Sequence, residues 1–308
     1  MNEQDQRGDV FYIVGPTASG KSEIAVEVAH RLGGEIVSAD AFQVYAGIPI
    51  LTAQPEAELR ARVPHHLVGT VPLQQILDAE QFRLAAKDAL RTIRARGKPA
   101  FIVGGSGLYV KALSDGLSLL PKANPDLRTR LEQLSEEELF VRLVHLDPKA
   151  AAEIDRRNKR RLLRAVEVCL LSGRPVSAQR RRPQPARNPA GVLLLRDRAE
   201  LYERINLRVQ RMFADGVVEE VRALDELGAT ATQALGLRQI FDLIQGRITE
   251  VECIAAIQQT TRRYAKRQLT WFQRQTSFEP LNLSRTGSSE AIEWIARRAR
   301  LSFAQNDD

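Results

Sequence analysis

An eight-residue stretch near the N-terminus has the residue types needed to hold a phosphate group. "GPTASGKS" (15–22) fits the pattern G-x-x-x-x-G-K-[ST]. In such a loop, backbone amides and the start of the following helix point toward an oxyanion, and Lys21 adds a positive charge. The Ser22 hydroxyl suits a Mg²⁺ ion. The pattern predicts a di- or triphosphate site formed by Gly15, Pro16, Thr17, Ala18, Ser19, Gly20, Lys21 and Ser22.

Two further side chains that could do chemistry follow strand-like runs. Asp40 ends "EIVSAD" (35–40), and Ser106 lies in the glycine-rich "GGSGLY" (104–109). In a parallel sheet both would lie at the carboxyl edge, where ligands bind in open α/β folds. Enzymes that bind nucleoside triphosphates usually carry a second Mg²⁺-binding carboxylate after a neighbouring strand. Asp40 could be that metal ligand or a base that faces a substrate, and spacing alone does not decide between them.

The elements that must position these residues follow an α/β pattern. Residues 10–14 and 100–105 are apolar runs typical of buried strands, and an amphipathic helix begins at Lys21. Strand, helix and strand at this spacing indicate right-handed crossovers and a parallel sheet. We expect an α/β fold with a P-loop-like parallel core and helices on both faces. After a last strand at 192–196, the chain is expected to be helical, including one long helix over 251–273.

A change of sequence character separates residues 121–186 from this core. Gly173 can end a helix over 159–172, and no strand-like run interrupts the region. Three helix-start signals occur in it. Asn124-Pro125 and Asp147-Pro148 are each a capping residue followed directly by proline. Ser135 is a capping residue with Glu138 three positions later, which is a capping box. We predict an all-helical insertion at 121–186 between two core segments, 1–120 and 187–308.

The distribution of charge favours an anionic partner. The formal net charge is +7, and "RRNKRRLLR" (156–164) carries six basic side chains in nine positions. A charge run by itself is more often a solvated face. A second basic segment changes that balance, because four cationic side chains fall on one helical face between 262 and 267. Two such segments suit a nucleic-acid backbone better than a small anion.

Composition argues against several other classes. The two cysteines lie 84 positions apart in apolar helical patterns, as expected for buried thiols in a reducing compartment. The four histidines show no metal-ligand spacing with them, which argues against a zinc site. The polar N-terminus does not fit a signal peptide, and no run of 18 apolar residues could span a bilayer. We expect a cytoplasmic protein without a membrane segment.

Taken in order, the motifs resemble one family, the tRNA dimethylallyltransferases (also called tRNA isopentenyltransferases), of the bacterial type. The resemblance runs from about residue 11 to 275 and includes ten segments: "GPTASGKS" (15–22), "D-x-x-Q-V-Y" (40–45), "PHHL" (64–67), "FIVGGSGLYVKAL" (101–113), "GLSLLP" (116–121), "DP" (147–148), "RLLRAVEV" (161–168), "LYERI" (201–205), "LGLRQ" (235–239) and "TTRRYAKRQLTWF" (260–272).

The resemblance implies a specific reaction. A dimethylallyl group would pass from dimethylallyl diphosphate to N6 of adenosine 37, next to the anticodon of a tRNA. The glycine-rich loop would then hold a diphosphate leaving group, with Mg²⁺ as cofactor and Ser22 as its protein ligand. The insertion would be a tRNA clamp. The expected partners are tRNA and dimethylallyl diphosphate, and a monomer is expected.

The resemblance also implies roles for individual residues. Asp40 matches the family's aspartate that accepts the amine proton, and Ser106 aligns with a hydroxyl residue near the transferring oxygen. Arg128 and Arg208 match arginines placed near the tRNA or the diphosphate. The residues expected to contact tRNA are Asp40, Ala41, Phe42, Gln43, Arg160, Arg161, Arg164, Leu235, Gly236, Arg238, Lys266, Arg267 and Gln268.

Some positions depart from the family pattern, and two rival functions stay open at this point. Ala41 replaces a common serine, "LTAQP" (51–55) replaces "GTAKP", "HHLVG" (65–69) replaces "HHLID", and Leu237 replaces a tyrosine. The first rival is a P-loop small-molecule kinase, which would consume ATP. The second is a non-catalytic RNA-binding protein with a vestigial loop.

Overall fold

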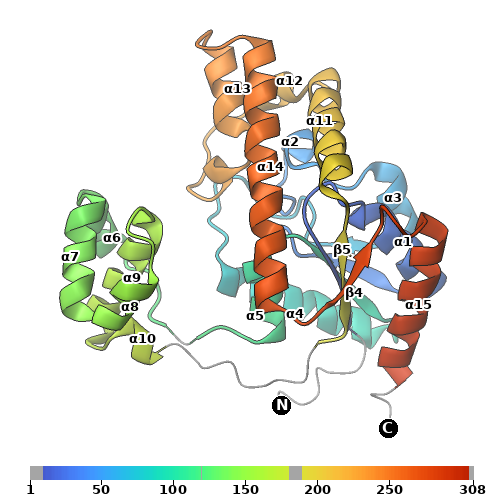
Figure 1. Cartoon of the computed structure of the whole chain (residues 1–308), viewed down its shortest axis with the longest axis horizontal. Coiled ribbons are helices and arrows are strands. Elements are labelled where there is room, and N and C mark those ends of the chain that lie inside the picture. Colours follow the sequence, from blue (N-terminus) through green and yellow to red (C-terminus); the bar gives the residue numbers. More distant parts are fainter. Residues whose placement is uncertain (1–9, 119, 180–188, 305–308) are drawn as a thin grey trace. The chain divides into compact units, whose positions relative to one another are not determined.

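The computed structural model describes residues 10–118, 120–179 and 189–304 (Figure 1). The chain divides into two compact units, one formed by residues 1–114 and 186–308 and the other by residues 115–185. The smaller unit contains the helices of the region predicted as an insertion at 121–186. The predicted boundary between 186 and 187 lies outside the described residues.

The larger unit is built on a six-stranded sheet in which each strand pairing is parallel. The strand order is β3-β2-β4-β1-β5-β6, so β1 lies in the middle with β4 and β5 beside it. The predicted parallel α/β fold is therefore confirmed. The strands are β1 (Val10–Val14), β2 (Glu35–Ser38), β3 (His65–His66), β4 (Ala100–Gly104), β5 (Gly191–Leu195) and β6 (Glu279–Asn282).

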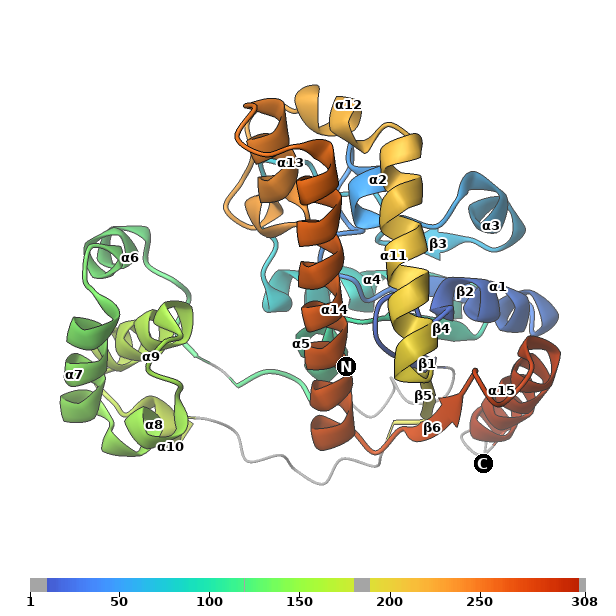
Figure 2. The same cartoon turned by 45° about the horizontal axis from the view of Figure 1, so that its top comes forward.

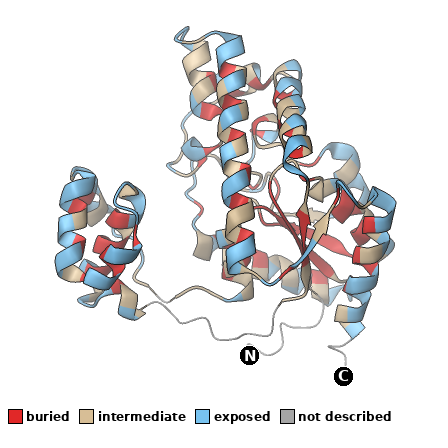
Figure 3. Ribbon diagram, in the orientation of Figure 1, coloured by how far each residue is buried: buried red, intermediate tan, exposed pale blue. Residues whose placement is uncertain are grey.

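Helices cover both faces of the sheet. Alternate side chains of a strand point to opposite faces, so each central strand contributes to the core on either side. In β1, Phe11 and Ile13 pack with helices α1 (Lys21–Arg31) and α15 (Ser288–Ala304). Tyr12 and Val14 face the other side and pack in a second core cluster, which takes its helical residues mainly from α4 (Ala79–Ala95), α5 (Gly107–Ser114), α11 (Arg198–Ala214) and α14 (Glu250–Gln275). Strands β1, β2, β4 and β5 are therefore almost entirely buried (Figure 3).

The expectation that the chain is wholly helical after the strand at 192–196 was wrong. Strand β6 follows α14 and pairs with β5 at the edge of the sheet. It has only four residues, two of them exposed, and it contains Pro280. Proline lacks the amide donor of a strand ladder and is tolerated in a sheet mainly at an edge. A short, half-exposed strand with a proline carries too little periodic signal to be found from sequence.

Helices α11 and α14 lie side by side in both views (Figures 1 and 2). The long helix predicted over 251–273 is confirmed as α14, whose start is fixed by a capping box between Thr249 and Glu252. No helix of the described chain is long and apolar enough to cross a membrane. The other short helices of this unit are α2 (Pro49–Thr52), α3 (Ala57–Arg62), α12 (Val217–Arg222), η2 (Ala231–Gln233) and α13 (Leu237–Ile244).

The described residues of the smaller unit form helices and no strand, and the helix-start signals predicted from the sequence are confirmed. Asn124 accepts from the Leu127 amide, Ser135 forms a capping box with Glu138, and Asp147 accepts from the Ala150 amide. Gly173 follows the fourth helix with a φ of 64°, a left-handed conformation that favours glycine. The helices are α6 (Pro125–Glu132), α7 (Glu136–Leu146), α8 (Pro148–Glu153), α9 (Lys159–Ser172) and α10 (Val176–Gln179).

Candidate active site

The loop between β1 and α1 has the backbone of a phosphate-binding turn. Gly20 precedes α1 with a φ of 94°, and Ala18 also has a positive φ, 63°. A side chain at Gly15 would collide with the Leu194 carbonyl of neighbouring β5. Glycine is therefore required at position 15 for close packing and favoured at position 20 for its backbone conformation. This turn brings the loop amides to the N-terminus of α1, where an anion is favoured.

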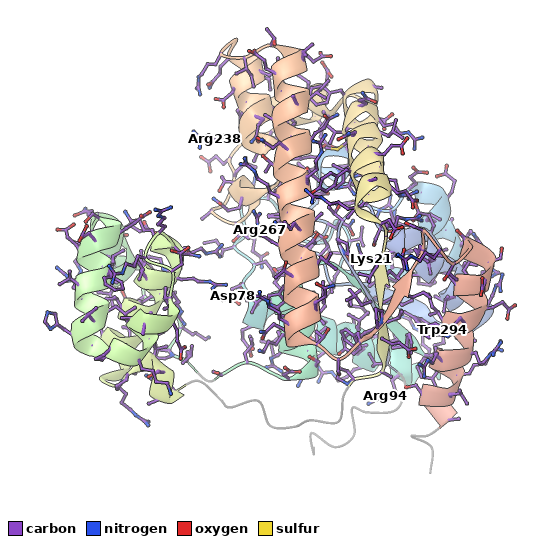
Figure 4. All side chains as sticks on the ribbon, in the orientation of Figure 1. Lys21, Asp78, Arg94, Arg238, Arg267 and Trp294 are labelled. Carbon is purple, nitrogen blue, oxygen red and sulfur yellow. The ribbon has the colours of Figure 1, made fainter. Side chains whose placement is uncertain are left out.

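Lys21 lies at the start of α1 and is labelled in Figure 4. Its Nζ donates to the Pro16 carbonyl at 2.6 Å, which folds the ammonium back over the loop. Burial lowers the pKa of Lys21 from 10.5 to about 8, while Asp40 opposes the shift and Arg208 adds to it. Asp40 and Arg208 are thus close enough to Lys21 to act on its charge. The sequence-predicted Lys21, Asp40 and Arg208 are brought into one site.

Asp40 follows β2, and the fold holds it by one oxygen. Its Oδ1 accepts from the amides of Phe42 at 3.0 Å and Gln43 at 3.3 Å. Within the described chain, Oδ2 accepts no hydrogen bond. The carboxylate is therefore oriented by a local turn and keeps one oxygen for a ligand.

Ser106 connects the end of β4 to the end of β2. Its Oγ accepts from the Ala41 amide at 2.9 Å, and its own amide donates to the Ala39 carbonyl at 3.1 Å. A side chain at Gly104 would collide with Ala39, so the two strand ends approach at backbone distance. The glycine-rich turn after β4 thus places Ser106 beside the residue that follows Asp40.

Arg208 is a half-buried cation on α11 without a carboxylate partner among the described residues. Burial lowers its pKa, and the charges of Asp40 and Glu23 oppose that shift. An arginine taken partly out of water without an ion pair is costly unless an anion neutralises it. Its position near Lys21 and Asp40 therefore favours an anionic ligand in the same place.

Tyr264 belongs to this site, although it was not among the residues predicted for it. Burial raises its pKa, the Asp40 charge raises it further, and the side chains of Ser106 and Gln268 oppose the rise. Tyr264 and Gln268 are four residues apart on α14, so they share one face of the helix. That spacing is the signal in the sequence that could have grouped them.

Two arginines that sequence reasoning did not select hold the outer side of the phosphate loop. Arg204 Nε donates to the Ala18 carbonyl, and Arg196 Nε donates to the Ser19 carbonyl, both at 3.0 Å. Arg204 lies on α11, and Arg196 lies between β5 and α11. The Ser19 hydroxyl is fully buried and has no hydrogen-bond partner among the described residues.

The residues expected to bind tRNA occupy different environments in the larger unit. Arg238 on α13 and the pair Lys266 and Arg267 on α14 are exposed, and Figure 4 labels Arg238 and Arg267. The Arg267 guanidinium lies over the Tyr264 ring. Gln268, in contrast, is buried. Others in the set form the turn after Asp40 or the start of α13: Ala41, Phe42, Gln43, Leu235 and Gly236, the last with a φ of 92°.

In the smaller unit, two of the predicted arginines hold a buried carboxylate. Glu167 is fully buried, and its Oε2 accepts from Arg128 at 2.8 Å and from Arg164 at 2.7 Å. Arg160 and Arg161, at the start of α9, are exposed. Arg128 and Arg164 therefore contribute to the packing of the insertion itself, and Arg160 and Arg161 are available on its surface.

Comparison with known proteins agrees with this geometry. The family model described as "IPP transferase" matches residues 43–275. A tRNA dimethylallyltransferase of Akkermansia muciniphila is 43% identical over 283 residues, which cover 92% of this chain and 96% of the relative. Another, of Citrifermentans bemidjiense, is 43% identical over 279 residues, covering 88% and 91%.

Solved structures agree as well. The tRNA isopentenylpyrophosphate transferase of Bacillus halodurans superposes with a TM-score of 0.72 at 33% identity and covers 98% of both chains. The resemblance read from the motifs is thereby confirmed, and the kinase and the non-catalytic RNA-binding protein are the less supported readings. The chain belongs to the tRNA dimethylallyltransferase family, and it is an enzyme of that family.

Proposed function

We propose that this enzyme binds dimethylallyl diphosphate in the loop 15–22 and transfers its dimethylallyl group to N6 of adenosine 37 in tRNA. One observation supports this most strongly: two cations, Lys21 and Arg208, lie in one site, and neither forms an ion pair among the described residues, although the charges of Asp40 and Glu23 act on both. Cations that no carboxylate pairs with can bind the oxygens of a diphosphate. The fully buried, unpartnered hydroxyl of Ser19 offers a further donor within the same loop.

The first half of the reaction is loss of the diphosphate. As the allylic C–O bond lengthens, negative charge grows on the leaving oxygens, and the loop amides, Lys21 and Arg208 stabilise it. The allyl carbon becomes electrophilic only as that bond breaks, so alignment of the two substrates matters more than a strong nucleophile. Ser106 would donate its hydroxyl proton to the transferring oxygen, since its lone pair already accepts from the Ala41 amide at 2.9 Å.

The second half is attack by the exocyclic amine of adenine. Its lone pair is delocalised into the purine, so removal of a proton during attack assists the step. We assign that base to Asp40. Its Oδ1 is held by the Phe42 and Gln43 amides, and its Oδ2 is left to accept the proton.

Mg²⁺ is the proposed cofactor, and the residues present fit a site completed by substrate oxygens. No cluster of three or more His, Cys, Asp or Glu suited to a metal occurs in the described ranges. Ser22, on the first turn of α1, is one of the residues that line a small cavity, together with Ser38, Gln43 and four others: Ile36, Pro55, His65 and Val103. When bound there, Mg²⁺ would supply positive charge to the diphosphate.

Recognition of tRNA is proposed to involve both units. The target adenosine must be extruded from its loop to reach Asp40, which costs a few kcal/mol of stacking. Ala41, Phe42 and Gln43 would line the pocket for the extruded base. The anticodon stem-loop would be held by residues of α9, of α13 with the residues before it, and of α14: Arg160, Arg161, Arg164, Leu235, Gly236, Arg238, Lys266 and Arg267.

Arg128 is proposed to supply one more cation to the substrates once tRNA is bound. Its ion pair with Glu167 fixes the position of the guanidinium, since Arg128 lies on α6 and Glu167 on the adjacent α9. The region 121–186 would act as the clamp on the tRNA, joined to the core segments 1–120 and 187–308. We expect the enzyme to act as a monomer and, because its substrate is tRNA, in the cytoplasm.

A direct assay tests the proposal. The enzyme is incubated with dimethylallyl diphosphate, Mg²⁺ and unmodified tRNA, and the tRNA is digested to nucleosides. We expect N6-(dimethylallyl)adenosine and one diphosphate per transfer, with no requirement for ATP. Absence of the prenylated nucleoside, or consumption of ATP with a phosphorylated product, would refute the proposed reaction.

The Asp40→Asn variant tests the assignment of the base. Asparagine keeps the Oδ1 acceptor for the Phe42 and Gln43 amides but cannot take the proton, so turnover should fall about 10²–10⁴-fold. Affinity for tRNA, measured by filter binding, should change little. Asp88→Asn, an exposed acid on α4, is the matched control. An unchanged turnover rate for Asp40→Asn would remove Asp40 from the mechanism.

A further inference from the structure

Gln268 makes two long-range hydrogen bonds from a buried position. Its side chain is 6% exposed on α14. Its Oε1 accepts from the Thr17 amide at 2.8 Å, and its Nε2 donates to the Gly105 carbonyl at 2.9 Å. Thr17 lies in the phosphate loop, and Gly105 lies in the turn after β4. One carboxamide therefore connects the two backbone segments that form the candidate site.

The surroundings of this carboxamide are closely packed. A side chain at Gly105 would collide with Nε2 of Gln268 and would also lie 3.1 Å from the Gly15 carbonyl. A side chain at Gly107, two residues further along the chain, would collide with the Trp271 ring of α14. The glycines of the "GGSG" turn thus allow α14 to approach the end of β4. The Thr17 amide and the Gly105 carbonyl require a side chain with one acceptor and one donor, and the carboxamide of Gln268 supplies both.

The two residues before Gln268 face the solvent. Lys266 and Arg267 are exposed, whereas Gln268 is buried. A helix turns about 100° per residue, so one short segment presents basic groups to solvent and an amide to the sheet edge. Gln268 was expected from the family resemblance to contact tRNA. In this structure both ends of its carboxamide already have partners inside the protein.

We propose that Gln268 is a positioning residue that sets the relation between the phosphate loop and Ser106. It acts by holding Thr17 and Gly105 in place and not by binding tRNA. The proposal rests on the proposed function, since it assumes that the loop carries the diphosphate and that Ser106 lies beside the transferring oxygen. Loss of both hydrogen bonds would release the loop from the β4 turn and misplace the leaving group relative to Ser106.

The Gln268→Leu variant removes both hydrogen bonds and keeps a comparable volume. Its kcat should fall on the order of 10²-fold, because a misplacement of about 1 Å can cost that much. Its KM for dimethylallyl diphosphate should rise, and binding of inorganic pyrophosphate with Mg²⁺, measured by calorimetry, should weaken by about tenfold. The Kd for tRNA should stay within about twofold of wild type.

A second variant and a control separate positioning from general damage. Gln268→Glu keeps the acceptor for the Thr17 amide but replaces the donor to Gly105 with an oxygen that repels the Gly105 carbonyl, so it should show the same pattern with a loss at least as large. It remains informative if Gln268→Leu fails to fold. Gln258→Leu is the matched control, because Gln258 lies on the same helix and donates to the Asn206 carbonyl at 3.4 Å, away from the loop. Its pyrophosphate affinity should equal that of wild type.

The opposite results would overturn the proposal. A loss of tRNA affinity of more than threefold in both Gln268 variants, absent from the control, would mean that Gln268 binds tRNA. Unchanged pyrophosphate affinity and unchanged kcat would mean that the two hydrogen bonds position nothing. The pyrophosphate measurement does not depend on turnover. If wild type itself fails to prenylate tRNA, the proposed function fails, and the effect of Gln268 on the loop is still decided.

Discussion

The environment of Lys21 makes the charge of this residue sensitive to pH just above neutrality. Burial brings its pKa down from 10.5 to about 8, whereas the nearby Asp40 charge acts in the opposite direction. A lysine in this range is cationic at neutral pH and loses its charge in mild alkali. Arg208, the second cation of the site, keeps its charge throughout this range because an arginine pKa lies far above it.

The affinity for a diphosphate should therefore depend on pH. As pH rises through about 8, Lys21 loses its proton and the site loses one positive charge, so binding of Mg²⁺ pyrophosphate should weaken above that pH. Calorimetric titrations between pH 6.5 and 9.5 measure this directly. Lys21→Arg is the control, because its cation persists and the fall near pH 8 should disappear. The same fall in Lys21→Arg would show that another group titrates.

The same shift has a consequence for stability. The pKa of Lys21 is lower in the folded chain than in the unfolded chain, so the folded state binds fewer protons between about pH 8 and 10.5. The contribution of this group to the free energy of unfolding therefore increases over that window and is least favourable below it. The site keeps a buried ammonium at neutral pH at some cost in stability, as expected for a group retained for binding.

At the element scale, α14 separates two tasks along one helix. Its exposed residues Arg263, Lys266 and Arg267 form a basic surface, whereas Gln268 and Phe272 are buried against the sheet. Arg262 differs from these three, because it donates to Asn206 of α11 and is not free on the surface. The exposed three are therefore the better candidates for phosphate contacts.

Neutralising these three residues should weaken tRNA binding and its dependence on salt. For Arg263→Gln, Lys266→Gln and Arg267→Gln combined, the slope of log K against log salt should decrease by about two to three, since each phosphate contact contributes about 0.7–0.9. Filter binding at several salt concentrations measures the slope. Arg297→Gln with Arg300→Gln, exposed residues of α15, is the control and should leave it unchanged. An unaltered slope in the triple variant would place the RNA elsewhere.

The insertion shows why charge patterns alone misjudge individual arginines. The basic run at 156–164 predicts a surface for a nucleic-acid backbone, and Arg160 and Arg161 are exposed as such a surface requires. Arg164, from the same run, pairs with Glu167 at 2.7 Å and donates to the Pro121 carbonyl at 2.6 Å. A fully buried carboxylate needs such partners, because an unpaired charge in a protein interior is costly. That need follows from the packing of α6 against α9 and not from residue spacing.

At the scale of the whole molecule, the chain consists of two units with separate hydrophobic cores. The phosphate loop and its side-chain supports, Gln268, Arg196 and Arg204, belong to the larger unit. Ligands that bind this loop should stabilise the larger unit, because binding to the folded state alone shifts local opening equilibria.

Amide hydrogen exchange should show which ligand protects which of the two units. Mg²⁺ pyrophosphate alone should slow amide exchange in residues 15–22 and leave the insertion helices α6 and α9 unchanged. Addition of tRNA should also slow exchange in α6 and α9, where Arg128 and Arg161 lie. Peptides of α15 serve as the internal control. Protection of α6 by pyrophosphate alone would mean that Arg128 reaches the diphosphate without tRNA, and no protection by tRNA would contradict the clamp.

The local features of this protein could be predicted from its residues alone. The phosphate loop, the strand–helix–strand order, the capped helices of the insertion and the family all follow from residue types at short, ordered spacings, which local backbone preferences can read. Tertiary structure decided the partners of individual side chains: Gln268 turned inward to Thr17 and Gly105, Arg164 turned to Glu167, and Tyr264 came beside Asp40. These pairings join residues up to 251 positions apart, and only close packing brings such groups within hydrogen-bonding distance.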